Sequence, residues 1–267
     1  MDLVTTDMLV VLCAFYGLLG ASLLSTHKRA YILDRNLKAW FIDIVSLLMQ
    51  GVVVPLVSTL VLVSSLQTIW PNAAGSLALH PILGFCLSFI AVDYLYYWNH
   101  RLLHHPWFFS IHAMHHVTPK MEILLTSRNS LLTPFFIVYV WCNALAIHVL
   151  TEPYYYLLGA ALTSALDIWR HSEFWPESNR AWQKHFQSLL MSPRHHSWHH
   201  TRKGMRCNYG ANLSIWDRFH GTYLDSCRTP RRPSQKYTLS LKDFFIFTKQ
   251  NDLKGKRDGG HVTTKAV

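Results

Sequence analysis

The stretch DYLYYWNHRLLHHPWFFSIHAMHH, residues 93–116, closes an apolar run and then presents two histidine groups. The first holds His100 and His104, and the second holds His112, His115 and His116. Residues three or four apart in a helix share one face, with Cβ atoms about 5 to 6 Å apart. Each group is therefore able to direct several imidazoles toward one point.

A similar pattern occurs far downstream, where His171 follows another apolar run and the motif HSWHH covers residues 196–200. A single HxxxH pair arises by chance on helical surfaces, but HxxHH occurring twice beside HxxxH is hard to explain by core packing. We interpret the clustered histidines as metal ligands. They are His100, His104, His112, His115, His116, His171, His196, His199 and His200.

The composition favours a membrane protein. Half of the 267 residues are hydrophobic and only 15% are charged, against about 25% in soluble proteins. The net charge of +10 is spread over several polar segments without a basic, aromatic-rich platform, so the sequence does not indicate nucleic-acid binding. The five cysteines include no CxxC pair, which indicates neither a disulfide framework nor a thiolate metal site.

Five apolar runs predict an all-α membrane protein with about four to five transmembrane helices and a cytoplasmic, histidine-rich cap that binds metal. The runs are residues 8–24, 40–66, 77–98, 131–150 and 154–169. Pro55 predicts a tilt or kink in the second run, and residues 26–39 are expected to form a polar loop. The fifth run is short, which leaves open a re-entrant or partly buried helix.

The basic residues predict the topology. All 25 lysines and arginines lie in residues 26–39, in residues 99–130 or after Trp169. The positive-inside rule then places the N-terminus outside and the histidine clusters and the C-terminus in the cytoplasm. We expect a multi-pass protein of a bacterial inner membrane or the endoplasmic reticulum, in which distant histidines meet in one cytoplasmic cap.

The chemistry of the clustered side chains indicates two metal ions. Neutral imidazole suits iron, zinc, copper and nickel, and nine histidines exceed the four ligands of a structural zinc site. Asp93 lies seven residues before His100 and Asp167 four before His171. Either aspartate could orient a histidine through its other ring nitrogen or bind metal directly, and spacing does not decide between these roles. His195 and His220 are likewise left open.

These motifs resemble the fatty acid hydroxylase and sterol desaturase superfamily of membrane-bound non-haem di-iron oxygenases. The resemblance covers residues 77–224 and is carried by five motifs: DYLYYWNHRLLHH, HAMHHV, RHSEF, SPRHHSWHH and NYGANLSIWDRFHGTY. It implies a catalytic domain at 77–224, preceded by transmembrane helices at 1–76 and followed by a basic cytoplasmic tail at 225–267. The nine histidines match the histidine boxes of the family. Asp167 stands where some relatives have a further histidine, and His220 replaces an apolar residue.

The resemblance also implies the reaction and its partners. We expect two iron ions, with zinc as a possible recovered metal, and the use of O2 to hydroxylate a C–H bond of a lipid. The sequence has no dinucleotide fingerprint, haem attachment motif or ferredoxin cysteine pattern. Electrons are therefore expected from a separate NAD(P)H-linked donor, through a reductase, ferredoxin or cytochrome partner.

Two alternative functions are also compatible with the sequence. A lipid or sterol desaturase of the same superfamily needs the same metal centre. A non-enzymatic metal transporter or membrane haem protein would instead need ionisable residues that form a path through the spans. The candidates for such a path are Asp43, Asp93, His148 and Asp167.

Overall fold

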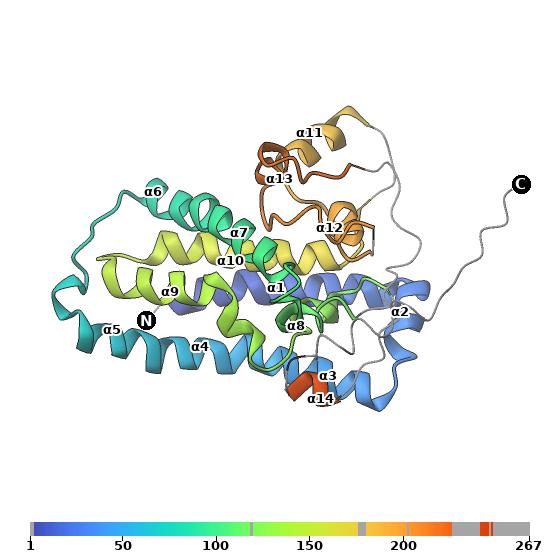
Figure 1. Ribbon diagram of the computed structural model, residues 1–267, viewed down its shortest axis with the longest axis horizontal. Helices are drawn as coiled ribbons and strands as arrows, with labels where there is room; N and C mark the ends of the chain where they lie inside the picture. Colours follow the sequence, from blue (N-terminus) through green and yellow to red (C-terminus); the bar gives the residue numbers. More distant parts are fainter. Residues whose placement is uncertain are drawn as a thin grey trace, which may run out of the picture.

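The computed structural model describes residues 3–117, 120–175, 180–201, 203–225, 241–245 and 247. Within these ranges the secondary structure is helical apart from two isolated β-bridges. Figure 1 shows long helices lying side by side along the long axis of the molecule, with shorter helices gathered toward one end. The predicted all-α architecture is confirmed.

Two helical segments are long and apolar enough to cross a membrane, namely Leu37–Ile69 and Pro81–Leu103. The first contains α3 (Leu37–Leu48), η1 (Met49–Val53), α4 (Val54–Val57), η2 (Ser58–Val63) and α5 (Ser64–Ile69). The second contains α6 (Pro81–Cys86), η4 (Leu87–Val92) and α7 (Asp93–Leu103). The π-helical turns η1 and η2 flank Pro55. Proline has no N–H group to donate within the helix, and the wider turns on either side allow the first segment to continue as a helix.

A third span is possible if α1 (Leu3–Leu24) and α2 (Thr26–Leu33) count as one broken segment, because the two helices meet at a bend of 103°. The described residues thus contain two or three candidate membrane spans, as expected of an integral membrane protein. The expected polar loop at residues 26–39 is wrong in part, since α2 occupies most of it.

The last two expected spans are not candidates by length and composition. The helix α9 (Val138–Val149) has only 12 residues, because the 3-10 turn η6 (Thr133–Phe136), with Pro134 near its start, takes up the beginning of the run. The helix α10 (Tyr154–His171) has 18 residues, but Thr163, Asp167 and Arg170 make it more polar than a membrane span. It packs instead against α1, α6 and η4.

The segments 67–76 and 151–153, which contain no lysine or arginine, meet at one end of the molecule. The amide of Gly75 donates to the His148 carbonyl at 2.9 Å, and the amide of Thr151 donates to the Leu77 carbonyl at 3.0 Å. Three of the helices that carry clustered histidines, α7, α8 (Phe109–His112) and α12 (Pro193–His199), approach one another toward the opposite end (Figure 1). The charge pattern predicts this separation of the two segments from the clustered histidines.

Gly159 allows α10 to approach η4 closely. A Cβ atom at this position would lie 2.9 Å from the Ser88 Cβ and 3.1 Å from the Phe85 carbonyl oxygen. Gly159→Ala is therefore expected to lower the free energy of unfolding by about 1 to 3 kcal/mol, measured by thermal unfolding in detergent. The matched control is Gly17→Ala, since nothing lies within 4 Å of a Cβ there. Equal melting temperatures for the two variants would contradict this packing.

Part of the C-terminal tail is docked on the bundle. The side chain of Phe244, in α14 (Leu241–Phe245), is fully buried against Ile42 and Met114. The amide of Leu131 donates to the Phe244 carbonyl at 3.0 Å. This short segment is therefore part of the core, whereas most of the expected basic tail, residues 226–240, 246 and 248–267, lies outside the described residues.

Candidate metal centre

Four segments that are distant in sequence bring the nine clustered histidines together. They come from α7 and its C-cap, from α8 and the turn after it, from the last residue of α10, and from α12 and its C-cap. Within each of two groups, the potential ligand atoms lie within 4.8 Å of one another. Group 1 is His100, His104, His112, His116 and His199. Group 2 is His115, His171, His196 and His200.

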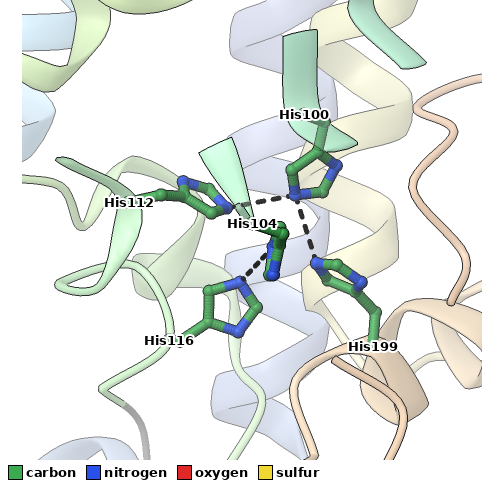
Figure 2. Close-up of side chains that lie close together, drawn as sticks. All are labelled: His100, His104, His112, His116 and His199. Atoms are coloured by element: carbon green, nitrogen blue, oxygen red, sulfur yellow. Dashed lines mark hydrogen bonds between the residues drawn. The ribbon is translucent and has the colours of Figure 1, made fainter. Parts of the chain in front are cut away.

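Figure 2 shows the five rings of group 1 converging on a common centre. The Nε2 atom of His100 lies 3.1 Å from the Nε2 atoms of both His112 and His199. In group 2, the Nε2 atom of His171 lies 3.1 Å from that of His196 and 3.3 Å from that of His115. Metal–nitrogen bonds of 2.0 to 2.1 Å separate neighbouring ligand atoms by about 3.0 to 3.4 Å. The spacing fits imidazoles around an ion.

The orientation of His100 and His199 supports this fit independently. The Nδ1 atom of His100 lies 2.8 Å from the Tyr209 carbonyl oxygen, and that of His199 lies 2.7 Å from the Cys207 carbonyl oxygen. A carbonyl only accepts, so both Nδ1 atoms carry the proton and both Nε2 atoms of the neutral rings present lone pairs. These lone pairs face each other at 3.1 Å, and such a contact is repulsive unless both nitrogens bind a cation.

Burial keeps these imidazoles in the form that binds metal. All nine histidines except the partly exposed His104 are buried. Desolvation and neighbouring imidazoles lower the pKa of His115 to about 3 and that of His199 to about 4. The same causes lower the pKa of His112, His116 and His200 well below the ordinary value. The rings are therefore neutral at physiological pH, so that no proton need be removed before an ion binds.

The two groups form one continuous centre. The ring of His116 in group 1 stacks on that of His200 in group 2, with centroids 4.4 Å apart. The rings of His112 and His115 stack in the same way at 4.9 Å. An ion in each group would thus give a pair of neighbouring ions, as the number of histidines predicts.

The two aspartates singled out in the sequence have different positions. Asp93 belongs to neither group: its carboxylate accepts from the Asn212 and Leu213 amides and from the Trp216 indole, at 2.8 to 3.0 Å. It thereby fixes the segment after Tyr209 to α7. Asp167 contacts His171 through its main-chain carbonyl, which accepts from Nδ1 at 2.8 Å, while its carboxylate pairs with Arg170.

Two further histidines lie beside the centre without joining it. His195 is fully buried, but its ring nitrogens contact the Ser192 and Tyr223 hydroxyls. His220 lies 3.2 Å from the Tyr94 hydroxyl and stacks on the Tyr97 ring. Both are therefore packing residues of the surrounding shell.

Asn208 begins the motif NYGANLSIWDRFHGTY, but the sequence alone assigned it no supporting role. It has a φ of 57°, a left-handed conformation that asparagine tolerates better than most residues. The carbonyls on either side of it, of Cys207 and Tyr209, are those that orient His199 and His100. The Asn208 amide donates to the carbonyls of His195 and Leu224, which holds this turn in place. The position of Asn208 at the start of a quoted motif is a signal in the sequence, but its contacts depend on the fold.

Comparison with known proteins gives a family and several distant relatives. Residues 85–222 match the family model described as "Fatty acid hydroxylase". Alkylglycerol monooxygenase of Xenopus tropicalis is 28% identical over 144 residues, which cover 52% of this chain and 30% of the relative. Ornithine lipid hydroxylase OlsE of Rhizobium tropici is 26% identical over 170 residues, covering 62% of this chain and 46% of the relative.

A third relative, very-long-chain aldehyde decarbonylase GL1-6 of Oryza sativa, is 28% identical over 140 residues, covering 49% of this chain and 21% of the relative. The chain therefore spans less than half the length of these curated relatives. No solved structure matches it significantly.

Proposed function

Because the chain belongs to the fatty acid hydroxylase family, we propose that it is a membrane-bound di-iron oxygenase that hydroxylates a C–H bond of a lipid with O2. The observation that carries this proposal is the pair of lone pairs facing each other on His100 and His199. This geometry is built for a cation inside a buried shell of neutral imidazoles. Residues 77–224 form the proposed catalytic domain.

The proposed roles follow from the geometry. The group 1 histidines would hold one ion and the group 2 histidines the other, and when bound the ions supply the activation of O2 that C–H oxidation requires. The Tyr209 and Cys207 carbonyls fix the rings of His100 and His199. Burial of eight of the nine rings, all except that of His104, limits the access of water to the centre. Electrons come from a separate NAD(P)H-linked partner, and the histidine groups face the cytoplasm.

The relatives favour hydroxylation over desaturation. One is named a monooxygenase and another a hydroxylase, and both names specify lipids. Insertion of oxygen into a lipid is therefore the proposed reaction, and a desaturase would differ only in its product.

The described residues argue against a transport path. Asp43 pairs with Arg35 and Arg128, and Asp93 binds amides and an indole. His148 lies 3.0 Å from the Trp70 carbonyl oxygen at the far end of the molecule. Each of these ionisable groups thus has a local structural partner, which favours the oxygenase over a transporter.

The test compares the lipids of cells that express the wild type or His199→Ala, together with a competent electron donor. Mass spectrometry is expected to show a lipid heavier by one oxygen in the wild type and absent in the variant. A loss of two hydrogens would identify a desaturase instead. His185→Ala is the matched control, because His185 is exposed on α11 (Ala181–Leu189). Identical lipid profiles for the wild type and His199→Ala would overturn the proposal.

A further inference from the structure

A cleft of about 650 Å³ opens beside group 1. Its lining includes Trp98, Arg101, Leu102, His104, Arg206 and Tyr209. Of the nine clustered histidines, His104 is the one that is partly exposed, so the cleft ends against a ring of the metal centre. A molecule seated in the cleft would therefore lie next to the centre.

The cleft is positively charged. The Arg101 guanidinium donates to the Tyr97 hydroxyl at 3.1 Å and lies over the Trp98 ring, 5.2 Å from its centroid. Arg206 is exposed and has no hydrogen bond or ion pair with any residue of the described part of the chain. None of the described lining residues is acidic. The charge of the two arginines is thus uncompensated inside the cleft, and guanidinium groups bind phosphate and carboxylate by paired hydrogen bonds.

The same cleft has an apolar wall at the end of a candidate span. Trp98 and Leu102 are 43% and 50% exposed, and both lie in the last two turns of the segment Pro81–Leu103. The end of a membrane span lies at the depth where lipid headgroups begin, and tryptophan is enriched there. The cleft therefore combines a site for an anion with a surface for an acyl chain.

We propose that this cleft binds the anionic headgroup of the lipid substrate, with Arg101 and Arg206 as the groups that recognise its phosphate or carboxylate. This inference rests on the proposed function and names the substrate class, a membrane lipid with a negatively charged headgroup. Trp98 and Leu102 contact the part of the chain next to the headgroup.

The test measures lipid binding to the full-length protein in detergent by native mass spectrometry. Dioleoylphosphatidylglycerol and dioleoylphosphatidylcholine carry the same chains, so any preference reports the headgroup. The wild type is expected to prefer the anionic lipid by about tenfold, the factor for one charge-assisted contact. The double variant Arg101→Gln/Arg206→Gln is expected to lose this preference. Arg206→Gln alone is expected to lose part of it, and this substitution breaks no hydrogen bond or ion pair within the described part of the chain.

The matched control is Arg29→Gln, since Arg29 is exposed on α2, away from the cleft lining; it should keep the full preference. An equal preference in the double variant and the wild type would overturn the proposal. Displacement of the lipid by inorganic phosphate at equal concentration would also overturn it, because the site would then be one for a free anion. A double variant that loses only electron transfer from a protein donor, with lipid preference unchanged, would reassign the cleft to that partner.

The failure of this inference is separable from that of the proposed function. An oxidised lipid product without headgroup preference would leave the oxygenase intact and remove the headgroup site. A headgroup preference that depends on the two arginines, without any oxidised product, would support the headgroup site and contradict the oxygenase.

Discussion

Replacing Asp43 by asparagine is expected to lower the free energy of unfolding by about 3 to 5 kcal/mol, the usual effect of removing one partner from a buried ion pair. Asp43 is fully buried in α3. Its two carboxylate oxygens accept from Nε and Nη2 of Arg128 at 2.6 Å, and one also accepts from Arg35 at 2.5 Å. Arg35 retains an ion pair with Glu122, but without Asp43 the buried Arg128 has no acidic partner among the described residues.

The control for this measurement is Asp34→Asn. Asp34 is exposed and lies just outside α2, so its loss is expected to change the free energy of unfolding by less than about 0.5 kcal/mol. Both variants are compared with the wild type by thermal unfolding in detergent. Similar melting temperatures for Asp43→Asn and Asp34→Asn would show that the pair contributes little to stability.

A second variant separates the effect of the ion pair on stability from its effect on the position of the clustered histidines. Arg128 also donates to the Val117 carbonyl at 3.2 Å, immediately after His116, and so links α3 to the turn that carries His115 and His116. Asp43→Met/Arg128→Met removes both charges together, which is often neutral for stability. We expect this double variant to recover most of the lost stability but to bind metal more weakly. If the double variant recovered both stability and metal binding in full, the ion pair would have no role in positioning the clustered histidines.

The convergence of the histidines could be predicted because two simple signals agree. Spacings of three and four residues place ligands on one helix face, and the lysines and arginines avoid residues 67–76 and 151–153. Those two turns indeed meet at the end of the molecule away from the histidines. Neither signal requires knowledge of the packing between helices.

The features of the site and the fold that could not be predicted depend on contacts between distant segments. The carbonyls of Cys207 and Tyr209 are present in every peptide unit, so no residue type marks their role in orienting His199 and His100. The spacing of Asp93 to His100 suggested a link to a ligand, but its carboxylate is taken by amides more than 100 residues away. The docking of Phe244 in the tail depends on its packing against Ile42 and Met114, which lie far away in sequence.

The division of the clustered histidines between two groups could not be predicted from the sequence either. The neighbours His115 and His116 belong to different groups, as do His199 and His200. Adjacent residues in a helical turn point about 100° apart, so one HxxHH motif supplies both groups. This division makes the contribution of each group separately testable.

His200→Ala is expected to remove the ion of group 2 while leaving that of group 1 bound. The His200 Nε2 atom lies 3.2 Å from that of His196, and without it group 2 has only three imidazoles. Metal analysis of the purified protein should therefore show about half the metal content of the wild type, with the lipid product reduced more than about 100-fold, since even outer contacts to ligands are worth 10- to 100-fold. His185→Ala should retain the full metal content and product, because that histidine lies in neither group. A His200→Ala protein with full metal content would show that group 2 does not hold an ion, and loss of all metal would show that the two groups bind as a single unit rather than as separable sites.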